Sequence, residues 1–239
     1  MESYESVSTW KQAMPSSASS VRRELLEHIT EQILEISPQR LRVAVDGYTA
    51  SGKTSFGHEL AAAIRAHGRS TLRASLDDFK NPWREAIEKG YDRISGEGYY
   101  RNAPDFASIR RLLLEPAGPR GSGTVVLCAH DPLTGFDHRD VTVQAPIDSI
   151  LIVDSVFALR AEYDAYWDFR IWLDVPAEIS LARGIDRDAV SEGRVEAELL
   201  HRDRYHEAER IYIAEVNPKT RADVVIDNTD FAKPALVRI

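Results

Sequence analysis

Eight consecutive residues have the types and spacing of a phosphate-binding loop. The segment 47–54, Gly-Tyr-Thr-Ala-Ser-Gly-Lys-Thr, matches the pattern G-x-x-x-x-G-K-[ST] at every fixed position. Glycines let successive backbone N–H groups converge on a phosphate, the lysine adds positive charge, and the threonine hydroxyl is a ligand for Mg²⁺. The residues predicted to hold a nucleotide and its metal are Gly47, Thr49, Ala50, Ser51, Gly52, Lys53 and Thr54.

The residues on either side of this loop predict the two elements that must position it. Residues 41–45 form a short β-prone run, and from Lys53 to His67 the apolar residues recur at helical spacing. The N-terminus of such a helix carries partial positive charge at the place where phosphates bind. The order of strand, glycine turn and helix therefore supports the motif.

Two further predicted strands end in carboxylates. Residues 70–74 lead into Asp77 and Asp78, and the apolar run 149–153 leads into Asp154. Ligands of open α/β sheets bind outside the carboxyl ends of the strands, so we expect these side chains to share a crevice with the loop. Asp154 is then a candidate for Mg²⁺ or its coordinated water. The alternative for each is an ordinary turn or strand-ending aspartate.

A basic segment follows the strand expected at residues 169–175. Arg183, Arg187 and Arg194 lie around Gly193, and guanidinium groups there could neutralise charge on a transferred phosphoryl group. Residues 183–195 are therefore a candidate lid. A solvated helix with Arg/Asp pairs is an equal alternative, because acidic residues are interleaved with the arginines.

Two insertions are expected on the substrate side, at residues 81–104 and 128–140. The first contains several aromatic residues, among them Tyr99 and Tyr100, which can stack on a flat ring or simply pack. The second lies between two short predicted strands and contains His130, Asp131 and His138. These three lack a further ligand at regular spacing, so a metal site there is the less favoured interpretation.

Composition limits the class of protein. The chain has 239 residues, 43% hydrophobic and 28% charged, and a formal net charge of -8. The negative charge argues against nucleic acid as a partner, the single cysteine excludes an intrachain disulfide, and no apolar run is long enough to span a membrane. We therefore expect a cytoplasmic protein, and a homo-oligomer is compatible with the sequence.

Strands and helices alternate along the chain without internal repeats. This order predicts an α/β fold with a doubly wound, mostly parallel sheet of about five strands, the last of them at residues 222–227. Residues 1–20 are polar and serine-rich, and we expect them to be mostly mobile. Residues 21–239 are expected to form one domain, beginning with an amphipathic helix that ends before Pro38.

Several stretches taken together resemble the uridine kinase and phosphoribulokinase family of P-loop kinases. They are the phosphate loop, Ser75–Phe79, Glu97–Tyr100 followed by Asp105, Ile152–Asp154, Leu181–Asp188 and Arg221–Ile226. The resemblance covers roughly residues 40–230. It implies ATP- and Mg²⁺-dependent transfer of a phosphoryl group to a primary hydroxyl of a small molecule.

The resemblance also implies roles for individual residues. Asp77 would accept the proton of the attacking hydroxyl, and Asp154 would lie near Mg²⁺. Asp105 would bind the sugar hydroxyls of the substrate. Arg183 and Arg187 match basic positions of the lid helix. The substrate-binding candidates are Asp77, Tyr100, Asp105, His130 and Arg194; the catalytic candidates are Asp77 and Lys53.

Three departures from the family bear on the substrate. Gly184 replaces an arginine common in uridine kinases, His130 replaces a tyrosine that helps to sandwich the base, and Ser155 replaces a glycine. The expected activity is phosphorylation of the 5′-hydroxyl of a pyrimidine nucleoside, with uridine first. The alternatives are a kinase for a pantothenate-like or sugar alcohol, a GTP-dependent switch, which the lack of an Asn-Lys-x-Asp element disfavours, and a nucleotide-binding regulator without catalysis.

Overall fold

The protein is built around a seven-stranded sheet. The computed structural model describes residues 2–10 and 19–238, and within these the strand order is β1-β3-β6-β2-β7-β8-β9. Every neighbouring pair is parallel except β8 and β9, which are antiparallel. The strands are β1 (Ser3–Glu5), β2 (Leu41–Gly47), β3 (Thr71–Ser75), β6 (Ile150–Ser155), β7 (Phe169–Asp174), β8 (Val224–Asp227) and β9 (Ala235–Arg238).

The five strands expected from the sequence form the centre of this sheet, and two more lie at its edges. The mostly parallel α/β fold is confirmed, whereas the number of strands exceeds the five predicted. Strands β1 and β9 contain three and four residues, too few for a clear alternating pattern. Strand β1 lies within the segment 1–20 that we expected to be mobile, and residues 11–18 of that segment are outside the described part of the chain.

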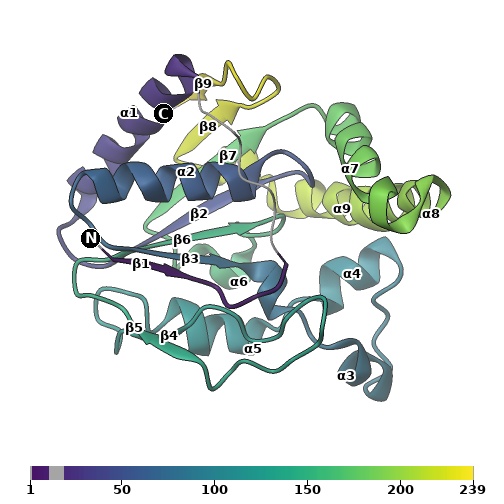
Figure 1. The fold of residues 1–239 in the computed structure, drawn as a ribbon. Helices are drawn as coiled ribbons and strands as arrows, with labels where there is room; N and C mark the ends of the chain where they lie inside the picture. Colours follow the sequence, from purple (N-terminus) through teal and green to yellow (C-terminus); the bar gives the residue numbers. More distant parts are fainter. Residues whose placement is uncertain (1, 11–18, 239) are drawn as a thin grey trace.

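Helices connect the strands and cover both faces of the sheet. Figure 1 shows α1 and α2 on one side, with α5 and a separate two-stranded hairpin on the other. The helices are α1 (Ser20–Ile36), α2 (Lys53–Ala66), α3 (Trp83–Glu88), α4 (Gly96–Asn102), α5 (Phe106–Ser108), α6 (Ala161–Asp164), α7 (Ala177–Glu192), α8 (Arg194–Leu199), α9 (Glu207–Val216) and α10 (Pro218–Arg221). The hairpin is β4 (Thr124–Val126) and β5 (Thr142–Gln144); a 3₁₀ helix η1 (Leu76–Phe79) and the π-helical segments η2 (Ile109–Leu114) and η3 (Leu200–His206) complete the elements.

The alternation of side chains along the strands produces two cores. Val43 and Val45 of β2 pack with α1 and α2, for example with Phe56, which is fully buried. Ala44, between them, faces the opposite core, where Trp172 of β7 also packs. A sheet buried on both faces is rigid, so the ends of its strands hold the residues that follow them in fixed positions.

Two groups of helices meet at the carboxyl end of the parallel strands. In Figure 1, α7, α8 and α9 lie at that end, with α3 and α4 facing them. The predicted insertion at residues 81–104 thus contains two short helices, and the predicted lid at 183–195 spans the junction of α7 and α8. Among the described helices, none is both long and apolar enough to cross a membrane.

Candidate active site

The phosphate loop joins β2 to α2, as its motif predicts. Gly47, Ala50 and Gly52 have positive φ angles of 153°, 57° and 92°. A Cβ atom at Gly47 would lie 2.7 Å from the carbonyl oxygen of Leu173, and at Gly52 it would lie 2.9 Å from Nδ2 of Asn228. Both glycines are therefore required by close contacts as well as by backbone conformation.

Side chains from distant parts of the chain hold the loop in shape. The backbone N–H of Thr49 donates to Oε1 of Glu209 at 2.6 Å, and Nδ2 of Asn228 donates to the carbonyl of Ser51 at 2.7 Å. Nζ of Lys53 donates to the carbonyl of Tyr48 at 2.7 Å, inside the same loop. Burial lowers the pKa of this lysine, although Glu209 and other nearby carboxylates oppose the shift.

Thr54 and Asp154 meet because β2 and β6 are neighbours in the sheet. The hydroxyl of Thr54 donates to Oδ2 of Asp154 at 2.8 Å. The other oxygen, Oδ1, forms a 2.5 Å ion pair with Nη2 of Arg73, which is buried on β3. Hydroxyl and carboxylate oxygens are hard ligands that suit Mg²⁺, which otherwise keeps waters and nucleotide phosphates as ligands. The pair fits the metal position expected from the sequence.

Asp77 and Asp78 point to different surroundings, although they are adjacent. Asp77 lines the cleft beside the phosphate loop and forms a 2.7 Å ion pair with Lys80. Asp78 is 3% exposed and accepts a 2.6 Å hydrogen bond from the hydroxyl of Ser6, behind the cleft. The expectation that both carboxylates face the crevice is therefore wrong, because consecutive residues of a 3₁₀ helix point about 120° apart.

The pKa values of Asp77 and Asp78 are shifted in opposite directions. Burial opposes ionisation of Asp77, but the charges of Lys80, Lys53 and Arg187 outweigh it and lower the pKa. Burial raises the pKa of Asp78 to about 7, and hydrogen bonds from the N-terminal serines offset only part of this. Asp77 is thus the carboxylate that is both ionised at neutral pH and open to the cleft.

The cleft at the strand ends has a volume of about 780 Å³. It contains both the phosphate loop and a second region, lined by aromatic and basic side chains, which we term the acceptor region. The aromatic residues of this second region are Trp10, Trp83, Tyr99 and Tyr205; the basic ones are Lys80, Arg84, Arg93, Arg187 and Arg204.

Of the predicted substrate residues, Asp77 and His130 line this cleft and the others do not. Tyr100 is 2% exposed and packs in the core beneath the guanidinium of Arg160, 4.0 Å from its ring centroid. Its neighbour Tyr99 lines the cleft instead and accepts a hydrogen bond from Lys80, because adjacent helical residues point about 100° apart. Asp105 caps α5 by accepting from the N–H of Ser108.

The three arginines of the predicted lid separate as well. Arg187 lines the cleft and pairs with Asp188 at 2.6 Å. Arg183 lies outside the cleft with its guanidinium carbon 4.2 Å from the ring centroid of Phe231. Arg194 forms exposed ion pairs with acidic neighbours on α7 and α8. The alternative of a solvated Arg/Asp helix therefore describes Arg194, whereas Arg187 lines the cleft that contains the phosphate loop.

The glycine that departs from the family pattern has a structural reason. A Cβ atom at Gly184 would lie 2.2 Å from Cε1 of His201, whose ring packs against α7. His201 is 1% exposed, and its Nε2 lies 2.7 Å from Oδ2 of Asp188. Gly184 thus makes room for a histidine that holds Asp188, the partner of Arg187.

His130 and Asp131 lie at the wall of the cleft. Among residues 2–10 and 19–238, no group of three or more histidine, cysteine or acidic side chains is arranged to hold a metal ion. Asp131 is occupied by the N-terminal segment, since its carboxylate accepts hydrogen bonds from the backbone and hydroxyl of Thr9. The N-terminal segment therefore forms one wall of the cleft, where Trp10 lies.

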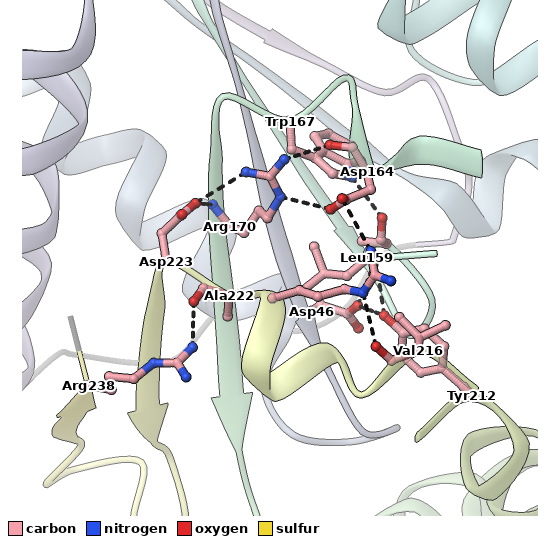
Figure 2. A network of polar contacts seen from close by, with 12 residues as sticks. Asp46, Leu159, Asp164, Trp167, Arg170, Tyr212, Val216, Ala222, Asp223 and Arg238 are labelled. Carbon is pink, nitrogen blue, oxygen red and sulfur yellow. Dashed lines mark hydrogen bonds and ion pairs between the residues drawn. The ribbon is translucent and has the colours of Figure 1, made fainter. Parts of the chain in front are cut away.

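Sequence reasoning missed several polar residues that support the site. Figure 2 shows one such group, in which Asp46 accepts hydrogen bonds from the N–H of Leu159 and the hydroxyl of Tyr212. Asp46 is fully buried, and burial raises its pKa to about 6. Its only signal in the sequence is a carboxylate immediately before the phosphate loop. Glu209 lies 155 or more positions after the loop and gives no local signal.

Comparisons with known proteins agree with this geometry at the level of the fold. No family model and no curated protein matches the sequence. A solved structure described as a possible uridine kinase from Bacillus stearothermophilus has a TM-score of 0.65 and 23% identity, with 85% of this chain and 97% of that chain covered. A "putative fructose transport system kinase" from Silicibacter sp. has a TM-score of 0.64 and 22% identity, with coverages of 79% and 94%.

A third solved structure, D-glycerate 3-kinase from Cryptococcus neoformans, has a TM-score of 0.50 and 10% identity, with 89% of this chain and 99% of that chain covered. At these identities the likeness concerns architecture. The protein shares the α/β fold of these solved structures, which are described as kinases. The family resemblance seen in the sequence is confirmed at the level of the fold.

Proposed function

We propose that this protein is an ATP- and Mg²⁺-dependent kinase that phosphorylates a hydroxyl group of a small molecule. One observation carries the proposal: an ionised carboxylate, Asp77, lines the same cleft as a complete phosphate loop. A loop that binds phosphate also occurs in switches and transporters. A carboxylate placed beside it supplies the proton acceptor that a hydroxyl nucleophile requires.

Each group of residues in the cleft has a separate role in the proposed phosphoryl transfer. Backbone N–H groups of Gly52, Lys53 and Thr54, at the positive end of α2, bind the phosphates, and Lys53 turns from the Tyr48 carbonyl toward the outer phosphates. Mg²⁺, when bound, neutralises phosphate charge, and Thr54 with Asp154 would hold it directly or through water. Arg187 stabilises the charge of the transferred group.

Asp77 orients the acceptor hydroxyl and accepts its proton. Its pKa is lowered, so it is ionised throughout the neutral range and is a weak base. The carboxylate therefore contributes mainly by fixing the hydroxyl in line with the γ-phosphorus and by taking the proton as the new bond forms. Lys80 holds Asp77 in that position through their ion pair.

The sequence and the lining of the cleft together favour two classes of acceptor molecule. A pyrimidine nucleoside, with uridine first, is the acceptor implied by the family resemblance, and the aromatic lining of the cleft suits a flat base. Another small alcohol is favoured by the absence of Tyr100 from the cleft and by the number of arginines in it. Both classes require the same catalytic residues.

The decisive experiment measures ADP release with ATP, Mg²⁺ and a panel of acceptors. Uridine, cytidine, pantothenate, simple sugars and short hydroxy acids cover the two classes. Turnover that depends on one acceptor and on both Lys53 and Asp77 supports the proposal. Tight nucleotide binding without any acceptor-dependent turnover would instead indicate a switch or a regulator, and preferential GTP binding would favour the switch.

A further inference from the structure

Two arginines in the acceptor region of the cleft have no carboxylate partner among the described residues. Arg93 lies between α3 and α4 and is 6% exposed. Its Nη1 donates to the carbonyl of Asn81, and its Nε has no hydrogen-bond partner. Arg204 lies on η3, and its Nε donates to the carbonyl of Ile94 at 3.0 Å. Both line the cleft.

A single aromatic side chain brings these two cations together. The guanidinium carbon of Arg93 lies 4.4 Å from the ring centroid of Trp83, and that of Arg204 lies 5.8 Å from it. The arginines come from segments more than a hundred residues apart, so only the folded chain places them side by side. Cation–π contacts hold the guanidinium groups but do not neutralise their charge.

The other cleft arginines differ in this respect. Arg84 pairs with Glu88, and Arg187 pairs with Asp188. Hydrogen bonds from Ser95 and Ile94 to the two carboxylate oxygens of Asp92 lower the pKa of Asp92, and the charge of Arg204 makes only a smaller contribution to this shift. A buried guanidinium beside a second one is unfavourable, and burial together with Arg204 lowers the pKa of Arg93. An arrangement of this kind is stabilised when an anion binds.

We propose that Arg93 and Arg204 form a subsite for an anionic group, a carboxylate or a phosphate, on the acceptor alcohol. This inference rests on the proposed kinase function and specifies its substrate class. Guanidinium forks bind such anions through paired hydrogen bonds, and the unpartnered Nε of Arg93 supplies one donor. Asn81 and Lys80 link this subsite to Asp77, so one small molecule can contact the anion subsite while presenting a hydroxyl to the base.

The anion subsite predicts a preference for charged over neutral acceptors, which the kinase function alone does not predict. A neutral nucleoside such as uridine leaves both arginines without a counterion, whereas a hydroxy acid or a sugar phosphate supplies one. We therefore expect the charged member of each matched pair to have a kcat/KM at least tenfold higher. Suitable sets are glycerol with glycerate and glycerol 3-phosphate, fructose with fructose 1-phosphate, and pantothenol with pantothenate; the carboxylates and phosphates in these sets distinguish the two anions.

The variants Arg93→Gln and Arg204→Gln test the residues themselves. Each should raise the KM for the charged acceptor by about ten- to a hundredfold, with a much smaller effect on kcat and on any neutral acceptor. Arg210→Gln is the matched control, because Arg210 lies on α9 outside the cleft, is exposed and pairs with Glu207. Its KM should stay within twofold of the parent value.

A binding measurement separates failure of this inference from failure of the kinase proposal. With the nucleotide site saturated by MgADP, millimolar inorganic phosphate or glycerate should raise the melting temperature of the parent protein and of Arg210→Gln. It should not do so in the double variant Arg93→Gln/Arg204→Gln. Preferential turnover of a neutral acceptor with unchanged KM in both arginine variants would overturn the anion subsite and leave the kinase function intact. No turnover with any acceptor, together with no anion-dependent shift, would overturn both.

Discussion

Replacing Asp77 by asparagine tests the central assignment, because the change removes a charge and preserves size. The amide cannot accept the proton of the acceptor hydroxyl. A positioned general base contributes about 10² to 10⁴ in rate, so we expect kcat to fall by that factor at saturating ATP and acceptor. The assay is acceptor-dependent release of ADP. The KM for ATP should change little, because Asp77 lies on the acceptor side of the phosphate loop.

The structure predicts that this variant stays folded. The side chains of Asp77 and Lys80 are 37% and 27% exposed, and a pair with this much solvent contact contributes about 0–1 kcal/mol to folding. For a chain of this size, the melting temperature should therefore fall by no more than about 2–4 °C. A large loss of rate in a protein with a nearly normal melting temperature would locate the effect in catalysis.

The pH dependence adds an independent check on Asp77. Because its folded-state pKa is lowered, ionised Asp77 stabilises the fold above the ordinary aspartate pKa of about 3.9, and this contribution is lost as the pH falls through the folded value. Its deprotonation should accordingly not limit kcat between pH 5 and 8. A decline of kcat with an apparent pKa of 6 or 7 that Asp77→Asn removes would contradict this description.

Asp78→Asn is the matched control, one residue away. Asp78 has a pKa raised to about 7, so the folded state binds a proton that the unfolded state releases at about 4. Stability of the parent protein should therefore decrease as the pH rises from about 4 to 7, and the asparagine variant should lack this decrease. At pH 8 we expect Asp78→Asn to melt no lower than the parent protein and to keep kcat within a few-fold. Nearly normal kcat in Asp77→Asn, or an equal loss in both variants, would refute the assignment of Asp77.

Three further changes test the parts that support the site. Lys53→Ala should lower kcat by about 10² to 10³, measured by ADP release, with a folded protein by circular dichroism; a nearly normal rate would exclude the proposed role. Glu209→Ala should lower the free energy of unfolding by about 1–3 kcal/mol in denaturant, because the N–H of Thr49 loses its buried acceptor. Glu209→Gln should recover most of this stability, because the amide oxygen can still accept the hydrogen bond. Equal stability of the two variants would contradict the role of Glu209. Gly184→Ala should lower the free energy of unfolding by about 1–3 kcal/mol, because the added methyl group displaces the His201 ring. In a variant that already carries His201→Ala, the same change should have a much smaller effect on stability. Additive losses of stability would show that the two residues do not compete for space.

Local patterns were enough to predict the framework of the site. The phosphate loop depends on contiguous residues, since its glycines, Lys53 and Thr54 act through spacing along the chain. The five central strands are apolar runs buried on both faces, so their position follows from hydrophobicity alone. The meeting of Thr54 with Asp154 followed from a general property of parallel sheets, whose strand ends gather at one edge.

Local patterns could not distinguish neighbouring residues of the same type. Asp77 and Asp78 are equivalent in sequence, as are Tyr99 and Tyr100. Only the orientation of a 3₁₀ turn and of a short helix assigns one of each pair to the cleft and the other to a buried site. Short edge strands such as β1 could not be predicted either, because three residues are too few to show a periodic pattern.

The sequence by itself determined that this chain has a phosphate-loop motif between a strand and a helix and that strand-end carboxylates accompany it, because both depend on short-range order along the chain. The tertiary structure alone decided which side chains line the rest of the cleft. Arg93 and Arg204 become neighbours only when α3, α4 and η3 pack around Trp83, and Glu209 reaches Thr49 only when α9 packs beside the loop. Contacts between residues so far apart in the chain are set by packing of whole elements, which no local spacing encodes.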